Sequence, residues 1–386
     1  MEVKAGYKQT EVGVIPEDWA VHQLGAVAFL ERGKFSARPR NQPRFFGGHI
    51  PFIQTGDVTN SNGSISTYTQ TLNSEGLRVS KLFPHETLFF TIAANIGDVG
   101  ITAFETAATD SLIAISPKTS IDKRWLYHSL KKRKKEFVAL ATQNAQLNIN
   151  LEKLRPYPLA VPPLPEQRAI AEALSDMDAL IGALDQLIAK KRDLKQATMQ
   201  QLLTGQTCLP GFNGKWERRT IAQIAPLQRG FDLPTSDIKT GNFPVVYSNG
   251  VLNYHANSMA KGPGVVTGRS GTIGKVTYVE QDYWPHNTSL WVTSFKGNDP
   301  KFIFYLYTAI GFERFGTGSG VPTLNRNDVH SFELDFPSDH AEQTAIAEVL
   351  SDMDAELAAL EQRRNKTRAL KQGMMQELLT GRTRLV

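Results

Sequence analysis

The sequence contains one long segment twice, and this repeat constrains the fold more than any other feature. Residues 166–209 recur as residues 342–385 without a gap, at an offset of 176, and 28 of the 44 aligned positions are identical. Both copies contain Ser-Asp-Met-Asp and, later, Leu-Leu-Thr-Gly. A self-match of this length indicates a duplicated structural unit.

Fainter matches precede each copy, since Trp19 and Arg32 correspond to Trp216 and Arg229 at an offset of 197. Each repeated segment therefore follows a related but diverged region. We predict four parts: a globular domain over 1–165, a helical segment over 166–205, a second globular domain over 206–341 and a second helical segment over 342–386.

The repeated segments have the spacing of coiled-coil helices, with apolar residues alternately three and four positions apart. The predicted seam comprises Ile170, Leu174, Met177, Ile181, Leu184 and Ile188, and then Ile346, Leu350, Met353, Leu357 and Leu360. So narrow a stripe favours helices that pair with each other over helices that each pack on their own domain. Two equivalent units related by a two-fold axis favour an antiparallel coiled coil over a parallel one.

The globular domains have the pattern of mixed α/β structure, so the predicted fold class is α+β with a pseudo-two-fold internal repeat. Short β-branched or aromatic stretches bounded by Gly, Asn or Pro predict strands at 50–54, 87–92, 111–115, 243–247, 264–267 and 289–293. Helices are expected over 123–141 and 301–315.

Charge and cysteine content limit the functional classes. The 43 Lys and Arg against 38 Asp and Glu give a net charge of +5, which is compatible with a nucleic-acid partner. The single cysteine, Cys208, excludes an intramolecular disulfide and a cysteine metal cluster, which favours a cytoplasmic location. The first residues lack the apolar core of a signal peptide. No apolar run is long enough to suggest a membrane partner.

Two glycine-rich stretches resemble cofactor loops but depart from them. Residues 268–276 resemble a phosphate loop, yet five residues separate the two glycines instead of four, and Val276 stands where Ser or Thr would bind magnesium. Residues 315–320 resemble a methyltransferase glycine motif, but the matching stretch of the first domain, 143–146, has no glycine. We expect no catalytic residue, no metal site and no cofactor bound by this chain.

The Pro-Pro-Leu-Pro-Glu-Gln at 162–167 and the Leu-Leu-Thr-Gly at 202–205 resemble the specificity subunits of type I restriction–modification systems. The resemblance covers essentially the whole chain. It departs where Ser338 to Gln343 replaces the first motif and where Gly373 replaces Ala197 in the second helix.

This resemblance implies a non-catalytic subunit with two target-recognition domains, each reading one half of a split, asymmetric double-stranded DNA site. The helices would set the gap and hold two modification (methyltransferase) subunits, which bind S-adenosylmethionine. Separate restriction subunits would supply the motor and nuclease with ATP and Mg²⁺. A 39-residue helix spans roughly 58 Å, which limits the half-site centres to about 17 base pairs apart and favours about 10.

Base reading requires polar side chains on loops. The candidates in the first domain are Lys34, Arg38, Arg40, Arg44, Gln54, Thr55 and Asn95, and those in the second are Arg229, Ser248, Asn249, Arg269, Ser270 and Asn287. The basic run 131–135 is either a phosphate contact or a solvated helix face.

Three alternatives stay open. The same subunit could serve a modification-only or phage-defence complex that lacks a restriction subunit. A coiled-coil adapter without a DNA role would show no sequence preference in a DNA selection. A fused methyltransferase would bind S-adenosylmethionine as the isolated chain.

Overall fold

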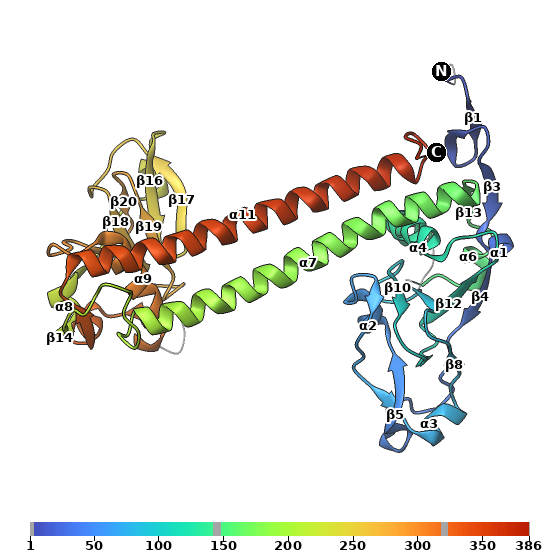
Figure 1. Cartoon of the computed structure of the whole chain (residues 1–386), viewed down its shortest axis with the longest axis horizontal. Coiled ribbons are helices and arrows are strands. Elements are labelled where there is room, and N and C mark those ends of the chain that lie inside the picture. The colour runs from blue at the N-terminus through green and yellow to red at the C-terminus, as the bar shows by residue number, and fades with distance from the viewer. Residues whose placement is uncertain (1–3, 142–147, 318–322, 386) are drawn as a thin grey trace. The chain divides into compact units, whose positions relative to one another are not determined.

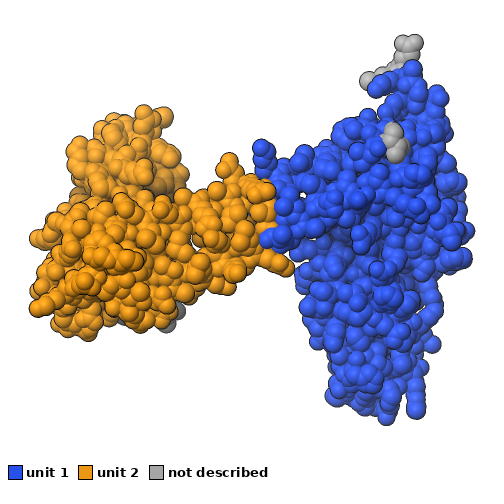
Figure 2. Space-filling view, viewed as in Figure 1, with its two compact units in different colours: residues 1–183, 364–386 blue, residues 184–363 orange. Residues whose placement is uncertain are grey.

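The computed structural model describes residues 4–141, 148–317 and 323–385, and it consists of two compact units (Figure 2). Unit 1 contains residues 1–183 and 364–386, and unit 2 contains residues 184–363. Two long helices, α7 (Leu164–Leu202) and α11 (His340–Leu378), each contribute residues to both units (Figure 1). Each unit thus combines one globular domain with parts of both helices.

The globular part of unit 1 has a five-stranded sheet in the order β4-β12-β9-β10-β6 and a four-stranded sheet in the order β7-β5-β11-β8. Its strands are β1 (Tyr7–Thr10), β2 (Gly13–Pro16), β3 (Ala20–Gln23), β4 (Ala28–Arg32), β5 (Phe46–Ile53), β6 (Ser64–Ile65), β7 (Thr71–Leu72), β8 (Leu82–Phe83), β9 (Leu88–Thr91), β10 (Val99–Thr102), β11 (Thr106–Ala108), β12 (Leu112–Pro117) and β13 (Pro158–Val161). Its shorter helices are α1 (Leu24–Val27), α2 (Thr55–Thr59), α3 (Ser74–Arg78), α4 (Lys123–Lys132), α5 (Lys134–Ala141) and α6 (Leu151–Leu154).

Unit 2 has sheets in the orders β15-β21-β18-β19 and β17-β16-β20. Its strands are β14 (Trp216–Thr220), β15 (Leu227–Arg229), β16 (Phe243–Tyr247), β17 (Gly250–His255), β18 (Gly264–Gly268), β19 (Val276–Val279), β20 (Trp284–Pro285), β21 (Ser289–Val292), β22 (Gly316–Thr317), β23 (Thr323–Leu324) and β24 (Glu333–Pro337). Its shorter helices are α8 (Ile221–Ile224), α9 (Pro300–Ile310) and α10 (Arg326–His330).

The two units repeat one topology. The order β4-β12-β9-β10 returns as β15-β21-β18-β19, and the parallel pair β5–β11 returns as β16–β20. The antiparallel pair β3–β13 likewise returns as β14–β24. The duplication indicated by the sequence therefore extends through the globular domains, and the predicted mixed α/β character is confirmed.

The predicted strands are confirmed, with bounds that shift by a few residues. The two domain helices are shorter than predicted. The first breaks at Arg133, which separates α4 from α5, and the second ends at Gly311, whose φ of 66° closes α9 in the left-handed region. Glycine adopts this conformation without steric cost, so it terminates a helix readily.

Within each unit the two long helices lie antiparallel. In unit 1, Asp178 of α7 pairs with Lys371 near the C-terminal end of α11. In unit 2, Lys195 near the C-terminal end of α7 pairs with Asp354 of α11. The predicted seam residues are buried or half-buried, but the first two of each helix, Ile170 and Leu174 in α7 and Ile346 and Leu350 in α11, belong to the core of the neighbouring domain.

The start of each long helix is fixed to its domain by a buried Glu-Gln pair. Gln167 accepts a hydrogen bond from the backbone N–H of Asp122, which caps α4, and donates to the carbonyl of Pro162. Gln343 makes the same two contacts, with the N–H of Asp299 and the carbonyl of Pro337. These contacts explain why Glu-Gln recurs in both copies.

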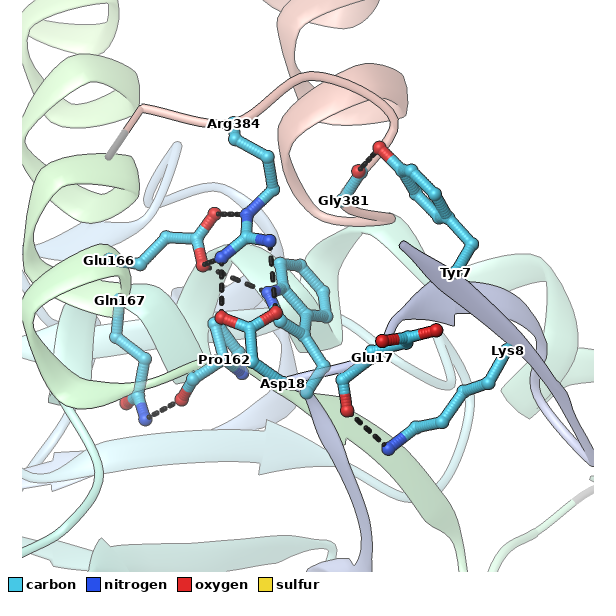
Figure 3. Close-up of polar contacts among 10 residues, drawn as sticks. Tyr7, Lys8, Glu17, Asp18, Pro162, Glu166, Gln167, Gly381 and Arg384 are labelled. Atoms are coloured by element: carbon cyan, nitrogen blue, oxygen red, sulfur yellow. Dashed lines mark hydrogen bonds and ion pairs between the residues drawn. The ribbon is translucent and has the colours of Figure 1, made fainter. Parts of the chain in front are cut away.

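The end of α11 is covered by the β1–β2 hairpin, which has no counterpart among the described residues of unit 2. Tyr7 donates from its hydroxyl to the carbonyl of Gly381, 2.9 Å away (Figure 3). A Cβ at Gly381 would lie 2.5 Å from the Pro16 ring. In unit 2 a groove of about 750 Å³ lies at the end of α7, with Leu203 and Leu334 in its lining.

Candidate nucleic-acid interface

Two of the three predicted arginines of the first domain, Arg38 and Arg40, approach one acidic side chain. Arg40 pairs with Asp110 at 2.6 Å between Nη2 and Oδ2, and Arg38 lies 4.0 Å from the same oxygen. Arg38 also donates to the carbonyls of Phe35 and Ala37. Both guanidinium groups remain about half exposed, with 59% and 49% of the side chains accessible. Asp110 therefore orients two cations that solvent still reaches.

Three of the predicted residues share one small pocket of about 270 Å³. Arg40, Gln54 and Thr55 line it, opposite a wall of packed phenylalanines, Phe35, Phe46 and Phe52. Gln54 donates from Nε2 to the Gln70 side chain at 2.7 Å, and this partner was not predicted from the sequence. Thr109 also lines the pocket, and its buried hydroxyl has no hydrogen-bond partner among the described residues.

Four candidates of the first domain lie outside this pocket: Arg38, described above, and Lys34, Arg44 and Asn95. Lys34 is exposed after β4. Arg44 is exposed, donates to the side chain of Gln42 and lies 4.7 Å above the ring of Phe45. Asn95 is exposed in the loop between β9 and β10, where it makes a long contact of 3.4 Å with Thr59 of α2.

In the second domain, Thr288 accepts hydrogen bonds from three of the predicted residues. Its carbonyl accepts hydrogen bonds from the backbone N–H groups of Arg269 and Ser270, at 2.9 and 3.1 Å. Its hydroxyl accepts from the N–H of Ser248 at 3.3 Å. All three residues are partly exposed, and their backbones meet at Thr288, so they form one loop cluster. Thr288 follows β20 and carries no motif that would have identified it from the sequence.

Two further candidates are held by a carboxylate. Arg229 donates to Oδ1 of Asp232 at 3.0 Å, and Asn287 donates to the same oxygen. The adjacent His286 stacks on Tyr247 with ring centroids 4.2 Å apart, and burial lowers the pKa of His286. Asn249, the last candidate, is exposed and accepts from the Lys275 ammonium through its carbonyl.

The basic run 131–135 does not form a single exposed face. Arg133 is buried and donates to the carbonyl and hydroxyl of Ser129, while Lys134 pairs with Asp98. Lys131 donates to the hydroxyl of Tyr127. Burial lowers the pKa of Lys132 to about 8. These internal contacts favour a structural role for the run over a strip of phosphate contacts.

The glycine-rich stretch 268–276 forms the turn between β18 and β19. A phosphate loop leads instead into a helix whose N-terminus faces the anion. Of the stretch 315–320, only residues up to Thr317 lie within the described part of the chain, and the matching stretch 143–146 lies outside it. No group of three metal-ligating side chains occurs among the described residues. None of the helices described is long and apolar enough to cross a membrane.

Comparison with known proteins gives the family. The model of the type I restriction modification DNA specificity domain matches twice, over residues 16–190 and 213–368. The chain belongs to this family. Each match contains one globular domain and most of the helix that follows it.

Relatives of this specificity subunit align over most of its length. The putative type I restriction enzyme MjaX specificity subunit of Methanocaldococcus jannaschii is 24% identical over 428 residues, covering 98% of this chain and 97% of the relative. The EcoprrI specificity subunit of Escherichia coli is 18% identical over 324 residues, covering 80% of each chain.

Solved structures show the same fold at low identity. The crystal structure of the type I restriction–modification S subunit from M. genitalium matches with a TM-score of 0.65 and 14% identity, covering 98% of both chains. A structure described as the basis of complex assembly and conformational transition of the type I system matches with a TM-score of 0.58 and 12% identity, covering 95% of this chain and 99% of the other. The two-domain architecture is therefore that of type I S subunits.

Proposed function

We propose that this specificity subunit reads a split, asymmetric DNA target, with each globular domain reading one half. The observation that carries the proposal is the pair of loop clusters, at Arg40, Gln54 and Thr55 in unit 1 and at Ser248, Arg269 and Ser270 in unit 2. The strand framework is common to both domains, whereas the polar side chains of the clusters differ. Such a difference suits two domains that contact different bases through Arg, Gln and hydroxyl groups.

In this proposal α7 and α11 form an antiparallel coiled coil that sets the gap between the half-sites. Support comes from the antiparallel contacts inside each unit and from the length of both helices, 39 residues. About 58 Å of helix allows half-site centres up to about 17 base pairs apart.

The same scaffold would hold two modification subunits, and the chemistry would reside in partners rather than in this chain. Modification subunits would bring S-adenosylmethionine, and restriction subunits would bring ATP and Mg²⁺. A modification-only complex would use this chain in the same way.

The deciding experiment is the methylation pattern of the host genome with the gene present and deleted. We expect deletion to abolish methylation at one split motif, two short half-sites around a fixed gap. An unchanged pattern, with the partner methyltransferase demonstrably expressed, would refute the proposal.

A further inference from the structure

Each long helix pairs one lysine with an aspartate of the other helix, and of these lysines Lys371 is buried and Lys195 is half-buried. In unit 1, Lys371 of α11 reaches Asp178 of α7, with 2.5 Å between Nζ and Oδ2. In unit 2, Lys195 of α7 reaches Asp354 of α11. The two lysines correspond at the offset of 176, and so do the two aspartates. Each helix therefore donates one lysine to the other and receives one.

These pairs are more buried than other ion pairs between the helices. The side chains of Lys371 and Lys195 are 8% and 19% exposed, whereas those of Lys191 and Arg192, which pair with Glu356 and Glu361, are 31% and 59% exposed. A buried ammonium group must keep its partner because desolvation is otherwise uncompensated. Separating either of these lysines from its aspartate, as a shift of one helix along the other would do, therefore costs free energy. An exposed pair loses less, because its charges can bind water or other partners instead.

The helix turn that carries each of these aspartates also contacts the helix of the adjoining domain. In unit 2 the hydroxyl of Tyr305, on α9, donates to Asp354 at 2.7 Å and lies 3.3 Å from the Ser351 hydroxyl. In unit 1 the equivalent position on α4 is His128, whose Nε2 lies 3.5 Å from the Ser175 hydroxyl. The turn from Ser175 to Asp178 in α7, and the corresponding turn from Ser351 to Asp354 in α11, therefore contact both the adjoining domain and the other long helix.

The apolar seam alone specifies the register weakly, and outside the seam Arg384 joins the end of α11 to Glu166 at the start of α7. Ile188 of the first copy corresponds to Arg364 in the second, so the apolar spacing of the second helix is interrupted after Leu360. Apolar residues at three- and four-residue spacing tolerate a slip to the next turn, whereas a single polar contact at the seam specifies the register. Both lysines and both aspartates have been retained in the two copies.

We propose that Lys195 and Lys371 are positioning residues that fix the register of α7 against α11 and thereby the gap that the subunit accepts between half-sites. This inference rests on the proposed function. Both helices contribute to both units, so a slip of one turn, about four residues, changes their spacing by about 6 Å. At about 3.4 Å per base pair this corresponds to a change of roughly two pairs in the gap.

The test measures binding of the full chain to duplexes that carry both half-sites at the cognate gap, at gaps changed by one and two pairs, or one half-site alone. We expect K195M/K371M to reduce discrimination between the cognate gap and gaps changed by two pairs about tenfold. Affinity for single half-sites should stay unchanged, because the loop clusters lie on other elements. The matched control R192M, which removes an exposed pair, should keep wild-type discrimination.

An exchange variant separates positioning from loss of folding. Combining K371D with D178K, and K195D with D354K, restores opposite charges at both sites, and we expect it to restore gap discrimination. Full discrimination in folded K195M/K371M would overturn the inference, as would an exchange variant that folds but does not discriminate. If the wild-type chain itself showed no preference for a split site, the proposed function would fail instead.

Discussion

Arg384 donates to both carboxylate oxygens of Glu166, a side chain that is completely buried (Figure 3). The same guanidinium also pairs with Asp18 at 2.7 Å, which lowers the pKa of that carboxyl. The indole of Trp19 donates to Glu166 as well, at 2.9 Å. The C-terminal tail thus neutralises the charge at the start of α7.

We expect Arg384→Ala to destabilise unit 1 by about 3 kcal/mol, because it leaves a buried carboxylate without its cation. Urea unfolding followed by tryptophan fluorescence measures the change. Arg382→Ala is the control, since Arg382 is 69% exposed in a 3.8 Å surface pair and such pairs contribute about 1 kcal/mol or less. Equal effects of the two substitutions would contradict the role given to Arg384.

Unit 2 lacks this cation. Cys208 occupies the position that corresponds to Arg384, and Lys215 the position that corresponds to Asp18. Glu342 is buried, and its Oε2 has no hydrogen-bond partner among the described residues. We expect C208R/K215D to stabilise unit 2 by about 1 to 2 kcal/mol, because charge-assisted hydrogen bonds replace an unsatisfied oxygen. Thermal unfolding of the double variant beside C208S tests this, and an unchanged Tm would mean that the two tails differ in geometry.

Acidification should weaken unit 1 through His128. Burial, followed by the nearby cations Lys371, Lys131 and Arg124, lowers the pKa of His128 to about 3. The unfolded chain binds this proton near pH 6.5 and the folded chain does not. The neutral imidazole of His128 therefore makes its full contribution to the free energy of unfolding above pH 6.5. Below that pH the free energy of unfolding declines toward pH 3, by up to about 1.4 kcal/mol per pH unit.

The matched variant is His128→Tyr, which copies Tyr305 of unit 2. We expect it to reduce the loss of Tm between pH 7 and pH 4.5, since no imidazole remains to be protonated. Because His286 and His330 also have lowered pKa values, the informative quantity is the difference between variant and wild type. Identical pH profiles would show that His128 does not carry the effect.

Arg269→Ala should weaken binding to the cognate site by about 1 to 3 kcal/mol, the range for one specific base contact, and leave the fold intact. Competition between cognate and scrambled duplexes is the measurement. Arg218→Ala is the control, because Arg218 lies on β14 and pairs with Glu333 and Asp335 of β24. If Arg269→Ala kept the wild-type preference for cognate over scrambled DNA, Arg269 would not be a base contact.

Arg133→Ala should lower stability rather than change the salt dependence of DNA binding. The substitution removes hydrogen bonds of 2.9 and 2.7 Å to Ser129, and losing a buried partner of this kind costs about 1 to 3 kcal/mol. The slope of log affinity against log salt counts phosphate contacts and should not change. Lys135→Ala, at an exposed position, is the comparison. If Arg133→Ala reduced the slope of log affinity against log salt and left the free energy of unfolding unchanged, the run 131–135 would be a phosphate contact after all.

The duplication, the two long helices and most of the strands could be predicted from the sequence alone. These features depend on local periodicity and on identity between residues 166–209 and 342–385, which need no knowledge of distant contacts. The sequence also named Arg40, Gln54 and Thr55 among the candidate DNA contacts, because polar side chains on loops are the residues that read bases, but it did not indicate that these three share one pocket.

Which side chains meet depends on the packing of the chain and could not be predicted from the sequence. Thr288 and Gln70 join the loop clusters through contacts between segments that no local pattern relates, and Arg133 is buried although it lies within a run of charges. Lys195 pairs with Asp354, and Lys371 with Asp178, because α7 and α11 run antiparallel. The sequence shows that these residues recur in both copies, but not that they pair between the helices. Burial and pairing are properties of the packed chain, and spacing along the sequence does not fix them.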